Sequence, residues 1–272
     1  MLYFFYVLGT LSFLYLALIF LTSPASRKHP DKEVLKGSFI AHRGLHNENE
    51  SIPENSLLSF QKALEKKLAI EIDIHLTKDG QIVVFHDENA KRMCGVDGKI
   101  EEMTLDEIKS LSLINTNEKI PTLQEVLSLV RGEVFLLIEF KVVNGNAAEL
   151  CKKANEILSD YKGKYLIQSF YPQVLSWYKK NRKDICRGQL SARFLKENLS
   201  KRLLGLQLFN FIGRPDFISF KHKDHSSVMF RFVKWQGAEN AGWTFRSEDE
   251  FEENKKHFNA WIFEGFDPFG RN

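Results

Sequence analysis

The feature that most constrains the fold is a repeated alternation between short apolar runs and amphipathic segments, from residue 37 to residue 272. Runs of strand character occur at 38–41, 69–76, 81–85, 134–140, 165–169, 187–190, 217–220, 241–245 and 261–263. Helical spacing of apolar residues occurs at 56–67, 104–111, 121–130, 147–159 and 172–180. Strands that alternate with helices in this way predict a parallel sheet with helical crossovers.

Polar side chains stand at or near the C-terminal ends of the predicted strands. They are His42, Glu71, Asp73, Glu139, Lys141, Ser169 and Trp243. In a closed barrel these ends converge on one face, where active sites are built. We therefore expect a (β/α)8 TIM barrel over residues 37–272, with a doubly wound open sheet as the alternative. Residues 87–120 lack strong periodicity and predict a small insertion after an early strand.

The N-terminal segment has the composition of a membrane span. Residues 1–21 are apolar apart from Gly9, Thr10 and Ser12, and no charged side chain precedes Arg27. About 20 apolar residues cross the hydrocarbon core of a bilayer. A cleaved signal peptide is the alternative, but a basic leading region is missing and the apolar run is long for one. We expect a transmembrane anchor at 1–26 and a short linker at 27–36.

The charge distribution favours a single-pass protein of the cell membrane with its catalytic domain in the cytoplasm. Positive side chains follow the apolar segment, and only the terminal amine precedes it: Arg27, Lys28, Lys32 and Lys36. Positive charge near a span favours the cytoplasmic side. Three widely spaced cysteines without a ligand-like spacing fit a reducing compartment: Cys94, Cys151 and Cys186. A net charge of +3 and no basic cluster interleaved with aromatics argue against nucleic acid as a partner.

Glu71 and Asp73 are two residues apart on a predicted strand, so their carboxylates point to the same side. Two buried like charges are costly unless a cation lies between them. A hard divalent cation with oxygen ligands meets this need, and Glu139 from another strand end can complete the ligand set. The alternative is a pair of exposed acids on an edge strand. Isoleucines at 70, 72 and 74 favour a strand whose other side is buried.

His42 and His86 each end a short apolar strand and bracket the acidic pair. A lone histidine in such a place is more often structural, but two of them beside a metal-like site favour proton transfer. Arg43 offers a planar fork for phosphate oxygens, and Lys141 adds a point charge. Both cations also have carboxylates nearby in sequence with which they can pair.

Other polar groups have supporting roles with open alternatives. Glu54 and Asn55 precede the helix at 56–67, so Asn55 either orients a carboxylate or histidine or only caps the helix. His75 lies on the same strand side as Glu71 and is expected to pack behind the site. Trp243 is either an apolar wall for the alcohol part of a substrate or a core residue.

At this point the chain resembles the glycerophosphodiester phosphodiesterase family. The resemblance rests on the segments at 41–44 (AHRG), 53–56 (PENS), 71–74 (EIDI), 77–80 (TKDG), 83–87 (VVFHD) and 138–141 (IEFK), with weaker matches at 169–170 and 243–244. It implies a (β/α)8 barrel with an insertion after His86. It also implies His42 and His86 as the acid–base pair, and Arg43 and Lys141 as phosphate ligands. A Ca²⁺ or Mg²⁺ ion would bind Glu71, Asp73 and Glu139.

The reaction that the resemblance implies is cleavage of a glycerophosphodiester into glycerol 3-phosphate and an alcohol. A lysophospholipase D acting on membrane lysophospholipids is one alternative, and a catalytically silent, membrane-tethered phosphodiester-binding module is another. The sequence departs from the family at its last strand, where Glu264 stands in place of a threonine and the spacing to Pro268 is shifted. This departure concerns the rim of the substrate pocket.

Overall fold

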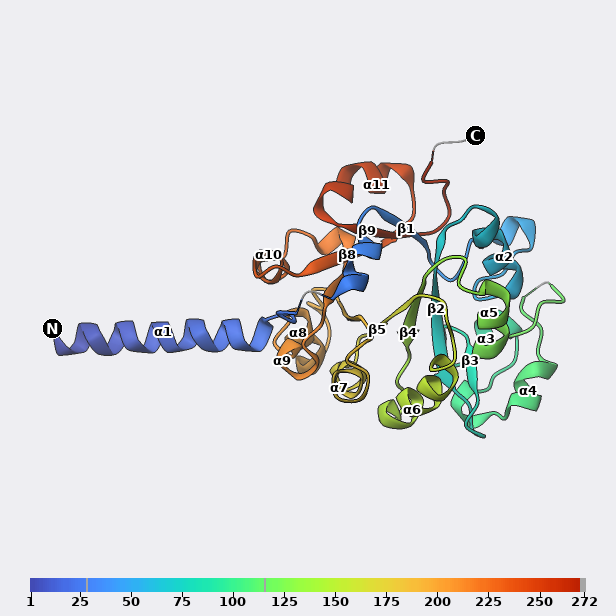
Figure 1. Ribbon diagram of the computed structural model, residues 1–272, viewed down its shortest axis with the longest axis horizontal. Helices are drawn as coiled ribbons and strands as arrows, with labels where there is room; N and C mark the ends of the chain where they lie inside the picture. Colours follow the sequence, from blue (N-terminus) through green and yellow to red (C-terminus); the bar gives the residue numbers. More distant parts are fainter. Residues whose placement is uncertain (28, 115, 270–272) are drawn as a thin grey trace.

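The computed structural model describes residues 1–27, 29–114 and 116–269. Within these residues, eight parallel strands close into a barrel in the order β1-β2-β4-β5-β6-β7-β8-β9, with β9 returning to β1 (Figure 1). The barrel strands are β1 (Ser38–Ala41), β2 (Ala69–Leu76), β4 (Leu136–Phe140), β5 (Tyr165–Ser169), β6 (Arg187–Ser191), β7 (Phe217–Lys221), β8 (Glu239–Phe245) and β9 (Ala260–Phe263). The predicted (β/α)8 barrel is confirmed, and the pairing of β1 with β2 rules out an open sheet.

Helices on the outside connect successive strands. They are α2 (Leu57–Glu65), α5 (Leu123–Val130), α6 (Ala147–Leu158), α7 (Pro172–Asn181), α8 (Leu199–Gly205), α9 (Asn210–Gly213), α10 (Val228–Trp235) and α11 (Glu248–Asn254). Short 3-10 turns are η2 (Glu48–Glu50), η4 (His222–Asp224) and η5 (Lys255–His257). Side-chain caps define several helix starts: the Thr122 hydroxyl accepts a hydrogen bond from the Glu125 amide, and the Glu125 carboxylate accepts one from the Thr122 amide.

Successive side chains along each strand point alternately outward to the helices and inward to the barrel interior. On β2, Ile70, Ile72 and Ile74 pack outward against the helices, and Glu71 and Asp73 face the barrel interior. The lower interior is filled by apolar side chains that are small, branched or aromatic: Ile40, Ala69, Leu137, Leu166, Phe217 and Ile262 are among them. Above this apolar layer, the inward positions nearer the strands' C-terminal ends are polar. The barrel interior is therefore closed by apolar packing at the N-terminal ends of the strands and lined by polar side chains at their C-terminal ends.

The strand β3 (Ile82–Val84) lies outside the barrel and pairs antiparallel with the upper part of β2. A turn joins the two strands, in which Gly80 has a φ of +77° and Thr77 Oγ1 donates to Asp79 at 2.6 Å. The insertion follows, with α3 (Lys91–Cys94), η3 (Ile100–Glu102) and α4 (Leu105–Ser110). It buries a small core of its own, which includes Phe85, Met93, Ile100, Ile108 and Leu113.

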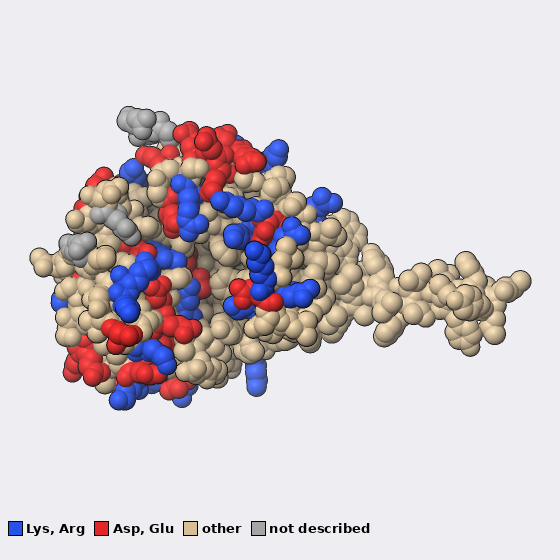
Figure 2. Space-filling view, turned by 180° about the vertical axis from the view of Figure 1, so that it is seen from behind, with Lys and Arg blue, Asp and Glu red and all other residues tan. Residues whose placement is uncertain are grey.

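The N-terminal helix α1 (Leu2–Thr22) projects from the domain, and its side chains before residue 17 are all exposed (Figure 1). It is long and apolar enough to cross a membrane, with a mean hydropathy of 2.2. In Figure 2 the helix carries no Lys, Arg, Asp or Glu, whereas the domain surface mixes both charges. Its last turn is held by the domain: Asn210 Nδ2 donates to the Thr22 carbonyl at 2.9 Å, and Arg214 donates to the Phe20 carbonyl at 2.8 Å.

The segment expected to be a linker packs against the barrel. It contains the 3-10 helix η1 (Pro30–Leu35), whose Leu35 is fully buried in the lower interior layer with Ile40. Arg27 makes an ion pair with Asp216, which is fully buried at the start of β7. Residues 29–36 therefore cover the bottom of the barrel. Lys28, one of the positive residues that follow the apolar segment, lies outside the described residues.

Candidate active site

Three carboxylates gather at the upper end of the barrel interior. Glu71 and Asp73 from β2 and Glu139 from β4 are each at most 7% exposed. Asp73 pairs in register with Glu139, and one oxygen of each acid lies within 4.8 Å of the others. The structure thus brings together the three residues that the sequence singled out as metal ligands.

Two cations neutralise part of this charge. Lys141 Nζ lies 2.9 Å from Asp73 and 2.6 Å from Glu139, and Arg43 Nε lies 3.3 Å from Asp73. Burial alone would raise the pKa of Asp73, but Lys141 and Arg43 hold that pKa well below its usual range. Burial raises the pKa of Lys141's partner Glu139, with the charge of Asp73 acting in the same direction.

The donor set fits a hard divalent cation. Burial raises the pKa of Glu71 well above its usual value, and the charges of Asp73 and Glu139 raise it further. A group in this state is costly to ionise unless positive charge is added beside it. The clustered ligand atoms of Glu71, Asp73 and Glu139 are all carboxylate oxygens, which Mg²⁺ and Ca²⁺ prefer.

The loop after β1 positions Arg43 and Asn55. Arg43 and Asn55 both have positive φ values, 55° and 52°, an uncommon conformation that recurs at functional sites. The Arg43 amide donates to Glu71 at 3.1 Å, and Asn55 Nδ2 donates to Asp73 at 2.9 Å. Asn55 therefore orients a carboxylate, while Ser56 caps α2 through its hydroxyl. Arg43 NH1 also pairs with Glu54 at 2.8 Å.

His42 and His86 line the same central cavity of about 120 Å³, together with Glu71, Glu139 and Lys141. Each histidine has its Nδ1 against a carboxylate: His42 contacts Glu264, and His86 lies 2.6 Å from Asp87. Burial lowers the pKa of His42 and lowers that of His86 to about 4. The contact at Nδ1 orients each imidazole and leaves Nε2 free to accept or donate a proton.

The remaining predicted residues take supporting places. Trp243 lines the cavity, donates from Nε1 to the Ser219 carbonyl at 3.0 Å and meets the Phe170 ring edge-on at 5.8 Å. His75 is buried behind the site, with Nε2 3.2 Å from the His86 carbonyl oxygen, as its expected packing role requires. Ser169 donates to the Phe140 carbonyl and lies outside the central cavity's lining.

Sequence reasoning missed several residues of the site. Asp87 was visible beside His86, but nothing in the sequence indicated Arg92, which joins Asp87 and Glu54 with contacts of 2.6 Å to each. Gln168 is 1% exposed, and its Nε2 lies 3.5 Å from Glu71 Oε1. It is two residues after the inward-facing Leu166 on β5, so it also faces the barrel interior. That spacing is the signal that could have identified Gln168.

Known proteins resemble this chain in sequence and in fold. A glycerophosphodiester phosphodiesterase of Caldanaerobacter subterraneus subsp. tengcongensis is 37% identical over 148 residues, which are 50% of this chain and 59% of that protein. A lysophospholipase D of Homo sapiens is 31% identical over 65% of this chain and 60% of that protein. These alignments thus span about 60% of the relatives' length.

A solved structure shares the fold. The phosphodiesterase of Oleispira antarctica, in complex with the product sn-glycerol-3-phosphate, has a TM-score of 0.71 at 24% identity, covering 86% of this chain and 94% of that one. The family model described as glycerophosphoryl diester phosphodiesterase matches residues 42–266, which include both histidines and all three buried acids. The chain belongs to the glycerophosphoryl diester phosphodiesterase family.

Proposed function

We propose that this protein hydrolyses glycerophosphodiesters to glycerol 3-phosphate and an alcohol. The observation that carries the proposal is that two histidines, two cations and the buried acids Glu71 and Glu139 line one cavity at the top of the barrel, with Asp73 clustered beside the two acids. The named activity of the Caldanaerobacter relative supports it. Glu71, Asp73 and Glu139 would hold a divalent cation, Ca²⁺ or Mg²⁺, which would polarise the phosphate and offset its charge.

The side chains supply binding and proton transfer. Arg43 and Lys141 approach the carboxylates from the cavity side and would share their charge with the phosphate oxygens of a bound diester. One histidine Nε2 would take a proton from the attacking water as its oxygen bonds to phosphorus, and the other would give a proton to the leaving alkoxide as the phosphorus–oxygen bond to the alcohol breaks. Asp87 and Glu264 stabilise the imidazolium forms because each faces an Nδ1.

The direct test is release of glycerol 3-phosphate from glycerophosphocholine by the full chain in detergent micelles. It is run with Ca²⁺, with Mg²⁺ and with a chelator, beside a His42→Ala variant. We expect metal-dependent release that falls roughly 10²- to 10⁴-fold in the variant. A folded protein that releases nothing with either metal contradicts the proposal and favours the silent binding module.

A specific observation favours a second candidate, lysophospholipase D activity on lipids in the bilayer. An apolar groove of about 670 Å³ is lined by Phe170, Phe194, Leu204, Phe209 and Ile212. Phe170 also lines the central cavity, so the groove begins at the site. Its far side is formed by α9, next to which the end of α1 lies, with Phe20 and Phe211 rings 5.9 Å apart. A single acyl chain would fit between the site and the membrane anchor.

We also propose that α1 anchors the protein in the cell membrane with the barrel in the cytoplasm. The proposal rests on the apolar helix and on the positive residues after it. A reporter fused after residue 272 and active only outside the cell would contradict the orientation. An N-terminus that begins after residue 22 in the mature protein would instead identify α1 as a signal peptide.

A further inference from the structure

Glu264 stands where the resemblance implies a threonine, and its place in the barrel explains what a carboxylate can do there. β9 pairs with β1 in register, Ile40 with Ile262 and Ala41 with Phe263. His42 and Glu264 are each the first residue after these strands, on the inward parity of Ile40 and Ile262. Closure of the barrel between its first and last strands therefore sets the two side chains against each other.

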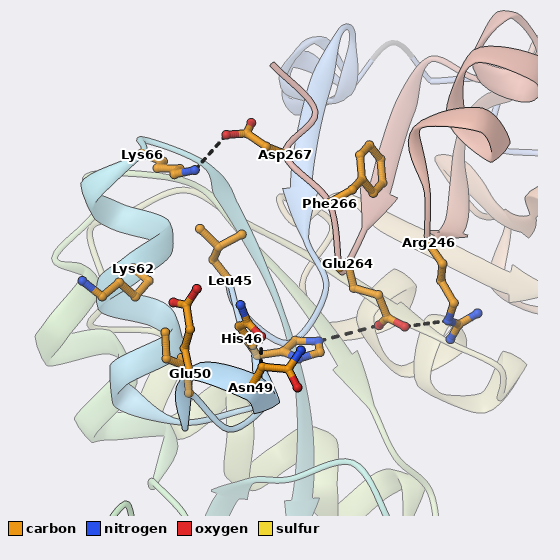
Figure 3. A pocket seen from close by; sticks show the side chains of 13 residues that line it. Leu45, His46, Asn49, Glu50, Lys62, Lys66, Arg246, Glu264, Phe266 and Asp267 are labelled. Carbon is orange, nitrogen blue, oxygen red and sulfur yellow. Dashed lines mark hydrogen bonds and ion pairs between the residues drawn. The ribbon is translucent and has the colours of Figure 1, made fainter. Parts of the chain in front are cut away.

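The Glu264 carboxylate is held on both oxygens. Oε2 contacts Nδ1 of His42. Oε1 accepts a hydrogen bond from Arg246 Nε at 2.6 Å, which Figure 3 marks. A second histidine, His46, has Nε2 3.7 Å from Oε2. The carboxylate side chain is only 17% exposed, so these contacts replace most of its hydration. Burial alone would raise the pKa of Glu264, but hydrogen bonding to His42 and His46 lowers it well below its usual range.

The same three groups, His42, His46 and Glu264, also lie close enough together to hold a metal ion. The guanidinium of Arg246 already neutralises the carboxylate at hydrogen-bonding distance, which disfavours a second cation there. The contact of Glu264 with His42 instead matches an acid–base histidine oriented by a carboxylate. Such a carboxylate fixes which ring nitrogen carries the proton and stabilises the imidazolium.

We propose that Glu264, itself held by Arg246, is the positioning residue for His42: it accepts the Nδ1 proton and so presents Nε2 of His42 to the substrate. This inference rests on the proposed role of His42 in acid–base catalysis. Glu264 touches no reacting atom, so we expect its effect on catalysis to pass through His42. This role also gives Arg246 a function, since its guanidinium holds Glu264 in place. Arg246 lines both the central cavity and the adjacent pocket of about 830 Å³ drawn in Figure 3.

The test compares the full chain with Glu264→Gln, which keeps the shape of the side chain and removes its charge. We expect kcat for glycerophosphocholine to fall at least about tenfold, since loss of an orienting carboxylate is costly for a catalytic histidine. KM should change less than about threefold, because Glu264 contacts no phosphate-binding residue. Glu252→Gln is the matched control: it removes the same charge from an exposed ion pair with Lys255, neither residue lines the central cavity, and the substitution should change neither constant.

A double-variant cycle and a spectroscopic measurement separate this role from a structural one. Adding Glu264→Gln to His42→Ala should cause no further loss, whereas multiplied losses would overturn the inference. Nitrogen-15 NMR of the His42 ring should show Nδ1 protonated in the native chain and a mixture of tautomers in Glu264→Gln. An unchanged His42 signal overturns the inference whatever the activity. Full activity in His42→Ala would instead refute the proposed function of the histidine.

Discussion

At the scale of single residues, the site is a chain of paired charges in which each catalytic candidate has a partner that fixes it. His86 is hydrogen-bonded to Asp87, and Asp87 forms an ion pair with Arg92. Arg92 also pairs with Glu54, which in turn pairs with Arg43. Opposite charges at these distances restrict rotation of long side chains and keep Arg43 over Asp73. Stability and chemistry are therefore coupled through Arg92, although it lines no part of the central cavity.

Replacement of Arg92 by alanine should make this coupling visible as a pH-dependent loss of stability. Arg92 and His86 hold the pKa of Asp87 at about 2 against burial, which opposes them. A carboxyl with a depressed folded pKa stabilises the protein above its unfolded pKa of about 3.9, and the contribution is lost as pH falls toward 2.

The native chain and Arg92→Ala should thus differ in urea-induced unfolding by up to about 1 kcal/mol at pH 7, as for part-exposed ion pairs. The difference should shrink between pH 4 and pH 2. Lys99→Ala, which removes an exposed lysine paired with Glu102, is the control. A difference that stays constant over that range would mean that Arg92 stabilises the fold by packing alone.

Glu71 offers a second prediction at this scale, through thermal stability measured without substrate. Because its pKa is raised by burial and by neighbouring acids, a divalent cation should stabilise the native chain by relieving that repulsion. We expect Ca²⁺ or Mg²⁺ to raise Tm, and Glu71→Gln to abolish the rise while leaving the metal-free protein at least as stable. A metal-induced rise of the same size in both proteins would exclude this residue as a ligand.

At the scale of elements, the bottom of the barrel is closed by a segment that precedes the first strand. Leu35 of η1 enters the lower interior layer and is fully buried. Residues 30–35 show no periodic pattern of apolar residues, because a six-residue 3-10 helix has too few turns to show an apolar face. The segment also fixes the geometry of the anchor, since Arg27 just before it is paired with the buried Asp216.

Leu35→Ala should therefore destabilise the barrel by about 2–5 kcal/mol, the cost of deleting a buried leucine side chain and leaving a cavity. Urea unfolding of the full chain in micelles measures this. Leu195→Ala is the matched control, because Leu195 is 66% exposed and its truncation should change stability by less than about 0.5 kcal/mol. A small effect of Leu35→Ala would show that η1 is dispensable and that residues 27–36 behave as a free linker.

At the scale of the whole molecule, the groove on α7, α8 and α9 extends from the site toward the end of α1, the proposed membrane anchor. The end of α1 is bonded to Asn210 and Arg214 of this region, and the groove opens beside Phe170 of the central cavity. With α1 inserted in a bilayer, as proposed, a lipid substrate could reach the cavity without leaving the membrane surface. A water-soluble diester needs no such groove.

Phe209→Arg, which places a charge in the groove, should separate the two substrate classes. Burial of each methylene contributes about 0.8 kcal/mol, so loss of acyl-chain contacts should lower kcat/KM for lysophosphatidylcholine by roughly tenfold or more. The value for glycerophosphocholine should change less than about threefold. Leu206→Arg carries the same charge on a side chain that is 44% exposed and outside the groove lining, and should change neither. Equal losses on both substrates would exclude the groove as an acyl site.

Much of the architecture was readable from the sequence because its signals are local. The alternation of Glu71 and Asp73 with three isoleucines identified both the strand and its two faces, and the structure has this strand at Ala69–Leu76. The strand expected at 134–140 begins two residues later, at Leu136. The helices α8 and α9 gave no signal, because pieces of seven and four residues carry too few apolar positions to set a period.

The sequence by itself determined the barrel class and the residues that meet at its top, since periods of 2 and 3.6 and the positions of strand ends are properties of neighbouring residues. Only the tertiary structure decided how those residues are paired. Glu264 meets His42 across 222 positions of sequence, and Arg92 meets Glu54 across 38. Such pairings depend on the register of the closing strands and on the path of an irregular insertion, and neither leaves a periodic trace in the sequence.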